Sequence, residues 1–398
     1  MIFICLGFCS SPKSLYISAI TEALDMSRGS FSINDSCRFI TTAIINLFFG
    51  FLISKFGQKK LIAAGFLSLI ASCITYSFAS NVFTFCIGGV LLGIGLSWTT
   101  TTMVSSIIGK WFKNKKATIL GFVLASNGIG GALATQILSP IIYSGNVFGY
   151  KNSYRLVALI LAVVGTLIII FLKTPPEDNE TAVKHSKKRR GQTWSGIEYK
   201  DVFKKWYFYA IAVCIFLTGF ILQSCTGVAA AHMKDTGIDA SYIATVLSIH
   251  SIALTSFKFI VGMLYDKFGL RITTFTCYIA TILSILALFF LTPTSTGKIL
   301  AIIYGIISSL ALPLETIMLP IYTSDLFGEK SFDKLLGLIV SINVAGYALG
   351  APIINLWFDT FGSYKVAFAI CIAIVVIIIV LLQFILNSAQ KVKKELSE

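Results

Sequence analysis

Residues 258–271 read KFIVGMLYDKFGLR, and a related pattern, GFLISKFGQK, occurs earlier at 50–59. The matched pairs are Gly50 with Gly262, Lys55 with Lys267, Phe56 with Phe268, Gly57 with Gly269 and Lys59 with Arg271. In every pair the second residue follows the first by 212 positions, as from Gly50 to Gly262. A fixed offset between glycines, aromatics and charges indicates an internal duplication. The acidic residue of the second copy, Asp266, is replaced by Ser54 in the first.

The composition is that of a membrane protein. Of 398 residues, 56% are hydrophobic and only 13% are charged, and several apolar runs approach the ~20 residues that cross a bilayer. The sequence therefore predicts an all-α membrane protein with twelve transmembrane helices in two six-helix halves. The expected spans are 1–23, 37–55, 60–79, 82–108, 117–143, 153–173, 204–231, 240–265, 272–292, 297–324, 334–357 and 363–387.

The distribution of positive charge predicts the orientation. Of the 32 Lys and Arg residues, 23 fall in loops on one side of the predicted membrane, 7 on the other and two within spans. The positive-inside rule then places both termini in the cytosol of a multi-pass cell-membrane protein. Because the net charge of +14 is confined in this way, it indicates contact with lipid and not with nucleic acid.

One long polar segment divides the chain. We expect an N-terminal half at 1–173, a cytosolic linker at 174–203, a C-terminal half at 204–387 and a cytosolic tail at 388–398. The linker contains KHSKKRR, a cluster expected to contact anionic lipid headgroups. No residue precedes the first span, so either Met1 is the natural start or the chain begins inside a longer gene.

The sequence shows no arrangement typical of an enzyme. It contains no phosphate-binding loop, no HExxH and no Ser/His/Asp constellation, and its nine cysteines lie scattered, mostly in apolar runs. We therefore expect no catalysis, no cofactor and no metal. Any transport must be driven by gradients of ions or solutes.

Three ionisable residues lie inside predicted spans, where charge is costly and usually functional. Lys13 is about 20 Å along its helix from Met1, Lys258 about 12 Å from the loop at Asp266, and Glu315 about 15 Å from Asp325, at 1.5 Å per residue. All three reach depths near the bilayer centre, where the substrate sites of transporters lie. Pro12 is expected to start or bend the first helix beside Lys13.

The duplicated turn resembles the signature loop of the major facilitator superfamily. Its structural residues would be Gly50, Gly57, Gly262, Asp266, Gly269 and Arg271. Its glycines let helices close tightly, and its acidic residue can sit at a neighbouring helix N-terminus. The loops at 111–122 and 320–337 resemble those of carboxylate transporters of the superfamily.

The first helix and position 258 resemble the monocarboxylate transporters and the oxalate/formate antiporters. The segment SSPKSLYISAI at 10–20 resembles the helix whose lysine takes part in substrate and proton binding. Lys258 falls where these families carry a membrane-embedded arginine that holds the carboxylate. The chain departs from the families at three points: a lysine replaces that arginine, Leu254 stands where an acid is expected, and span 11 offers only Asn343.

The resemblance implies a substrate site at Lys13 and Lys258, with Tyr16 and Asn343 as further cavity-lining candidates. Asn343 could equally join two helices. Glu315 is either a proton carrier or a neutralising partner for a lysine. We expect Glu22 and Arg38 near the outer surface, paired or solvated, and His232 and His250 at the surface.

The predicted function is secondary active transport of small carboxylates by alternating access. Candidate substrates are lactate, pyruvate, formate or oxalate, moved by proton symport or anion exchange by a carrier that acts as a monomer. Two alternatives stay open. One is a carrier of the same fold for another organic solute, and the other is a non-transporting membrane sensor.

Overall fold

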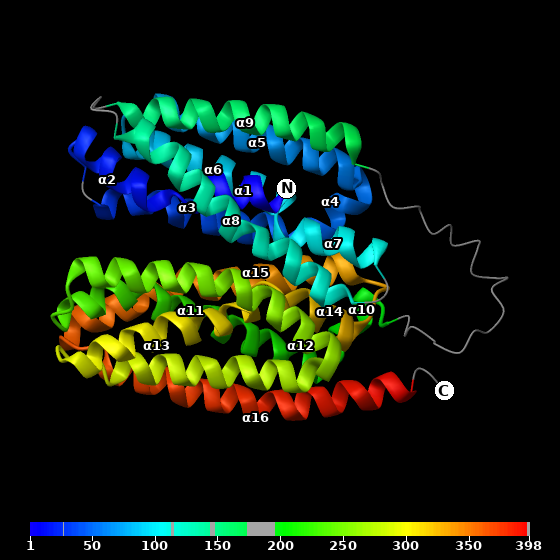
Figure 1. Ribbon diagram of the computed structural model, residues 1–398. Helices are drawn as coiled ribbons and strands as arrows, with labels where there is room; N and C mark the ends of the chain where they lie inside the picture. Colours follow the sequence, from blue (N-terminus) through cyan, green and yellow to red (C-terminus); the bar gives the residue numbers. More distant parts are fainter. Residues whose placement is uncertain (27, 113–114, 144–147, 173–195, 396–398) are drawn as a thin grey trace.

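The computed structural model describes residues 1–26, 28–112, 115–143, 148–172 and 196–395, and these residues form helices and no strands (Figure 1). The first half of the chain holds α1 (Ile2–Cys9), α2 (Lys13–Ala23), α3 (Arg28–Leu47), α4 (Phe49–Phe56), α5 (Gln58–Phe78), α6 (Val82–Thr99), α7 (Thr101–Trp111), α8 (Lys116–Ile142) and α9 (Gly149–Phe171). The rest holds α10 (Tyr199–Val202), α11 (Trp206–Asp235), α12 (Ala240–Phe289), α13 (Ser295–Ala311), η2 (Leu312–Glu315), α14 (Met318–Phe327), α15 (Phe332–Phe361) and α16 (Lys365–Glu395).

These helices make twelve spans once those interrupted within a span are joined. The joined sets are α1 with α2, α3 with α4, α6 with α7, and α13 with η2 and α14, while α12 makes two spans. By length and hydropathy alone, nine helices of the described residues could cross a membrane, or ten if α3 and α4, bent by 60°, count as one span. The two spans that this hydropathy count leaves out are the second span of α12 and the pair α1–α2, whose two helices are short.

The structure moves three predicted boundaries. The second span begins at Arg28 and not at residue 37, the break in α12 is a single residue, and α16 continues to Glu395, so the predicted tail begins as helix. The predicted linker falls largely on residues 173–195, outside the described residues. The short α10 lies in its remaining part.

The twelve spans pack as two bundles that lie side by side (Figure 1). One hydrophobic core is built from the first half alone, around side chains such as Phe66, Phe85 and Tyr154. The other is built mainly from the second half, around Tyr322 and Phe327, and reaches into α7 and α8. The first half is therefore α1–α9 and the second half α11–α16.

The duplicated turns have the same backbone conformation. Gly57 has φ 76° and ψ 159°, and Gly269 has φ 77° and ψ −179°. Residues with a side chain rarely adopt this positive φ, so glycine is required in both copies. The two turns lie at one end of the bundles, with α10 and the N-termini of α8 and α15. We call it the signature-loop end (right in Figure 1).

The matched glycines Gly50 and Gly262 bring the two halves together at this end. A Cβ on Gly50 would lie 2.3 Å from the Cα of Lys334 in α15, and one on Gly262 would lie 2.3 Å from the carbonyl oxygen of Ala117 in α8. Each glycine thus sits against the first turn of a helix of the opposite half. The duplication places the same close approach twice in one interface.

Polar contacts reinforce the closure. The Asp266 carboxylate accepts a hydrogen bond of 2.8 Å from the Thr118 N–H, in the first turn of α8, where the helix dipole favours negative charge. Lys110 lies 3.2 Å from the Asp333 carboxylate, and Lys116 forms a second ion pair across the halves. At the same end of the bundle, the Arg271 guanidinium donates a hydrogen bond to the Asn387 side-chain oxygen of α16.

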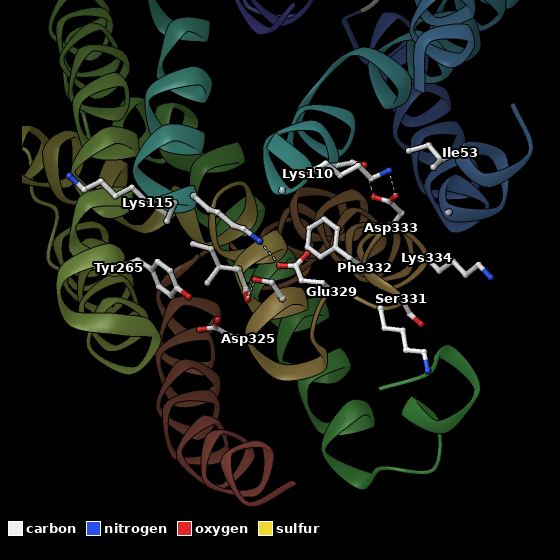
Figure 2. Close-up of a pocket in the computed structure, with 18 of the residues that line it drawn as sticks. Ile53, Lys110, Lys115, Tyr265, Asp325, Glu329, Ser331, Phe332, Asp333 and Lys334 are labelled. Carbon is white, nitrogen blue, oxygen red and sulfur yellow. Dashed lines mark hydrogen bonds and ion pairs between the residues drawn. The ribbon is translucent and has the colours of Figure 1, made fainter. Parts of the chain in front are cut away.

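These charges surround a recess of about 830 Å³ between the halves. Figure 2 shows the Lys110 ammonium directed at Asp333, with Glu329, Asp325 and Tyr265 around the same space. The recess is lined by side chains of both signs, and ion pairs join Lys110 and Lys116 of the first half to acids of the second. We assign it to the closed contact between the halves.

Replacing Gly50 by valine is expected to separate the halves at the signature-loop end, because the new side chain overlaps the α15 backbone. Spin labels at the exposed residues Lys60 and Lys267, on a background without reactive cysteines, report the separation by pulsed EPR. Their distance should lengthen in Gly50→Val. The matched control is Gly109→Val, since a Cβ there meets only the Phe332 ring, at 3.9 Å. An unchanged distance in Gly50→Val would refute this role.

Candidate functional site

The first span is broken beside Lys13. Its helix α1 ends at Cys9 and α2 starts at Lys13, because Pro12 has no N–H to donate and its ring clashes with a continuing helix. The Ser10 and Ser11 N–H groups both turn back to the Leu6 carbonyl. The break therefore presents Lys13 and two serines at the middle of the span.

Lys13 pairs directly with Asp35 of α3, a residue that the sequence pattern did not single out. The same carboxylate lies 3.8 Å from the Nε of Arg38. The side chains of Lys13, Asp35 and Arg38 are 35%, 18% and 13% exposed, so the cluster is mostly, not fully, withdrawn from solvent. One acid is shared by two cations.

Arg38 does not lie near the outer surface, which corrects the expectation from sequence. Because α3 begins at Arg28, Arg38 is about 15 Å along the helix at 1.5 Å per residue, close to mid-span. Its guanidinium donates a hydrogen bond of 3.0 Å to the Ser10 hydroxyl and lies 4.3 Å from the Phe39 ring centroid. Glu22 is exposed on α2 and is not the partner of Arg38 in this structure.

The packing of α6 on α3 fixes the direction of these side chains. A Cβ on Gly93 would lie 2.6 Å from the Arg38 carbonyl oxygen, and one on Gly89 would touch Asn34. Asn34 also accepts a hydrogen bond of 2.8 Å from the Tyr76 hydroxyl of α5. Small residues thus let α6 approach α3 closely beside Asn34 and Arg38.

Lys258 lies in α12 at the interface of the two halves. The residue is only 6% exposed, and its backbone carbonyl lies so close to α8 that a Cβ on Gly121 would be 2.4 Å away. Within the described part of the chain, no carboxylate oxygen comes within 4.0 Å of its ammonium group. The acid whose charge acts on it is Glu315.

Glu315 lies at a second break, where α13 gives way to the short 3-10 helix η2 between Ala311 and Met318. Pro313 and Pro320 limit the regular hydrogen bonding of this stretch. The Oε2 atom of Glu315 is buried and has no hydrogen-bond partner in the structure. Helix breaks in spans 1 and 10 thus place ionisable groups at mid-span in both halves.

Tyr347 of α15 connects the charged residues of the two halves. Its ring packs against Phe39 with the centroids 5.3 Å apart, and the phenol lies within electrostatic range of both Arg38 and Glu315. Just beyond it, Ser341 donates to the Ala43 carbonyl across the same interface, at 2.5 Å. The sequence pattern did not single out Tyr347.

The structure separates Tyr16 and Asn343 from this group. Tyr16 is 4% exposed, its hydroxyl is 2.7 Å from the Ser153 hydroxyl, and its ring stacks on Tyr154 in the core of the first half. Asn343 donates a hydrogen bond of 3.2 Å to the Ile215 carbonyl, which joins α15 to α11. For Asn343 the structure agrees with the alternative interpretation, a bond between helices.

The two histidines are not surface residues, so the expectation for them was wrong. His232 is 6% exposed, and its Nε2 lies 3.0 Å from the Leu288 carbonyl oxygen. His250 is partly buried and its Nδ1 lies 3.0 Å from the Ser308 hydroxyl. Both tie neighbouring helices together within the second half. In the residues described here, no three His, Cys, Asp or Glu side chains gather as they would around a metal ion.

We call the mid-span ionisable residues of the two halves together the central group: three cations, Lys13, Arg38 and Lys258, and two carboxylates, Asp35 and Glu315. If all are ionised, the group has one uncompensated positive charge. A surplus charge at mid-span is unfavourable unless water or an ion of opposite charge accompanies it. The arrangement is suited to bind an anion.

Comparison with known proteins gives the family. The model of the Major Facilitator Superfamily matches residues 1–314 and again residues 213–398, which together cover the whole chain. The chain belongs to this superfamily. It is therefore a multi-pass membrane protein, and its twelve spans in two halves are the fold of that superfamily.

Three relatives align over most of their length. The Uncharacterized MFS-type transporter YcxA of Bacillus subtilis (strain 168) is 27% identical over 397 residues, covering 95% of this chain and 91% of its own. The sialic acid transporter NanX of Escherichia coli (strain K12) is 22% identical, covering 86% and 81%. Human monocarboxylate transporter 2 is 25% identical, covering 83% and 72%.

Solved structures agree on the fold. The proton:xylose symporter XylE, bound to 6-bromo-6-deoxy-D-glucose, superposes with a TM-score of 0.76 at 13% identity, covering 97% of this chain and 94% of its own. The transporter FucP in the outward conformation superposes with a TM-score of 0.71 at 16% identity, covering 96% of each chain. At these identities the likeness concerns the fold alone.

Replacing Asp35 by asparagine is expected to destabilise the protein, because it leaves two cations at mid-span without a carboxylate. Breaking a fully buried ion pair costs about 3–5 kcal/mol, and the partial exposure of Lys13 lowers the expected loss to roughly 1–3 kcal/mol. The melting temperature in detergent should fall, and the double variant Lys13→Met/Asp35→Asn should recover part of it. Asp239→Asn, at an ion pair whose acid is 72% exposed, is the matched control and should change little. Equal effects of Asp35→Asn and Asp239→Asn would contradict the compensating role of Asp35.

Proposed function

We propose that this protein is a secondary active transporter that moves small carboxylate anions across the cell membrane by alternating access. The observation that supports the proposal most strongly is the surplus positive charge at mid-span, between the two halves. Lys258 supplies the charge from the second half, and the cluster of Lys13, Asp35 and Arg38 supplies it from the first. One monocarboxylate would neutralise the group.

The relatives support an organic acid as substrate. Those with named substrates above transport sialic acid and monocarboxylates, and both kinds of molecule carry a carboxylate. The structural neighbours for xylose and fucose share only the fold, and their substrates carry no charge. A carrier for an uncharged solute has no evident need for an unpaired cation at the middle of its interface.

The closed signature-loop end gives the proposal a direction. We place this end in the cytosol, in agreement with the distribution of Lys and Arg in the loops. The paired contacts of Gly50 and Gly262 then close the inner side, and a substrate reaches the central group from outside. Transport requires these contacts to break while the far ends of the halves approach, and a single chain contains every part that this motion needs.

The charge count also bears on coupling. With all five groups ionised, the empty carrier has one net charge and the carrier with a bound monocarboxylate has none. Moving the charged empty form through the membrane is costly, so this state favours exchange of anions. Proton symport becomes favourable if a lysine releases its proton in the empty carrier, because the empty and loaded forms are then both neutral.

Glu315 is, on this count, a neutralising partner for Lys258 and not the proton carrier. If Glu315 carried the proton together with a monocarboxylate, the empty and the loaded carrier would each keep one net positive charge, and both reorientations would be costly. Glu315 and Lys258 also lie within electrostatic range of each other, which supports the same role.

Replacing Lys258 by glutamine is expected to abolish the surplus charge and, with it, anion transport. Uptake of labelled formate, lactate, pyruvate and oxalate into proteoliposomes should fall at least about tenfold, the effect of losing one hydrogen bond to a charged group. The control is Lys365→Gln, at an exposed lysine of α16 at the other end of the bundle. Uptake by Lys258→Gln equal to that of wild type would refute the site.

The same vesicles test the mode of transport. Uptake that needs an internal anion indicates exchange, and uptake driven by an inward proton gradient into empty vesicles indicates symport. If the folded wild-type protein moves none of the four anions in either condition, the proposed substrate class is wrong.

Replacing Glu315 by glutamine should shift the preference from monocarboxylates towards oxalate. The surplus would rise from one positive charge to two, and a dianion would then neutralise it better than a monoanion. We expect the concentration of oxalate that halves formate uptake to fall by about tenfold relative to the concentration of lactate that does so, since 1.4 kcal/mol is tenfold. A proton-carrier role predicts a different result: loss of proton-driven uptake with unchanged relative affinity for oxalate.

A further inference from the structure

We propose that Arg38, and not Lys13, is the residue of the first half that binds the substrate carboxylate, and that Lys13 serves to hold Asp35 in position. This inference rests on the proposed function and specifies its site. It assigns a role to a residue that the sequence pattern places at the membrane surface and that the structure places at mid-span.

The ammonium group of Lys13 is already paired with a carboxylate. Its ammonium contacts the Asp35 carboxylate directly, and an ammonium is a point charge that one close carboxylate largely satisfies. Lys13 also follows the break at Pro12, so its backbone position is fixed by the short turn between α1 and α2. A substrate at Lys13 would have to share the ammonium group with Asp35.

Arg38 retains donors that its neighbours do not satisfy. A guanidinium has five N–H groups in a fixed plane. Among the described residues, the Arg38 side chain makes one hydrogen bond, of 3.0 Å to the neutral Ser10 hydroxyl, and its 3.8 Å separation from Asp35 is too long for another. The ring of Phe39 covers one face of the guanidinium plane and leaves its edge for a ligand.

Arg38 lies beside the contact between α3 and the second half. Its guanidinium packs on the Phe39 ring, and that ring meets Tyr347 of α15. Tyr347 in turn lies within electrostatic range of Glu315, which acts on Lys258. Arg38 and Lys258 thus approach the same interface from opposite halves.

The chemistry of the two cations is complementary. A lysine at 258 cannot grip a carboxylate with two parallel hydrogen bonds, but a guanidinium can. Arg38 would hold both oxygens of the carboxylate while Lys258 adds a second positive charge from the other half. Because each half supplies one cation, a bound anion would draw the halves together, as alternating access requires.

The test measures anion binding and uptake in four variants and one control. Arg38→Gln should raise KM for the preferred carboxylate by roughly 10- to 100-fold, or abolish uptake, and Arg38→Lys should raise it by about tenfold because the two-bond grip is lost. Lys13→Met/Asp35→Asn, which removes a pair without changing net charge, should raise KM much less than Arg38→Gln does. Arg155→Gln, at an exposed arginine of α9 near Phe78, is the matched control. Lys258→Gln should lose anion binding, as Arg38→Gln does.

Binding is read independently of transport as the rise in melting temperature that the carboxylate causes. A rise in wild type and in Lys13→Met/Asp35→Asn, but none in Arg38→Gln, supports the assignment. Unchanged KM in Arg38→Gln, or loss of binding in the double variant with retention in Arg38→Gln, overturns it and leaves carboxylate transport intact. If the wild-type protein neither binds nor moves carboxylates while folded, the proposed function itself fails, and this assignment fails with it.

Discussion

Charge placed at the middle of a membrane must be compensated nearby, and this constraint shapes the centre of the protein. Two spans are broken at mid-depth, at Pro12 and at η2, and the breaks give Lys13 and Glu315 a place among polar atoms and neighbouring helices. Asp35 pairs with Lys13, and Glu315 lies within electrostatic range of Lys258. In the proposed carrier these two acids leave one positive charge uncompensated, and the substrate anion supplies the missing charge.

The sequence predicted the parts of the fold that repeat. Gly57 and Gly269 share a positive φ that only glycine adopts readily, so a match by residue type was also a match by conformation. Lys258 and Glu315 were predictable because long apolar runs on both sides define their depth. Each of these inferences used local information alone.

The sequence could not place Arg38, because the stretch 28–35, RGSFSIND, is rich in polar residues and favours a loop before the predicted second span at 37–55. Neighbouring helices pack closely on this stretch of α3. The Tyr76 hydroxyl donates a hydrogen bond to Asn34, and Gly89 and Gly93 let α6 approach. Tyr16 was predicted to line the cavity, because its contact with Ser153, far along the chain, cannot be read from the local sequence. The spacing of Asp35 and Arg38, three residues apart on one helix face, was the available signal.

The shortfall of one charge and the closed signature-loop end are connected. Each half contributes rigid helices, so a change at the centre reaches the ends as rotation of one half against the other and not as local rearrangement. The inner contacts at Gly50 and Gly262 are close but depend on small residues and exposed ion pairs, which contribute little stability each. In the proposed carrier, an anion bound between two cations on opposite halves would add an attraction between the halves at their centre. Occupancy of the centre can therefore decide which end is closed, provided that the cations lie on different halves.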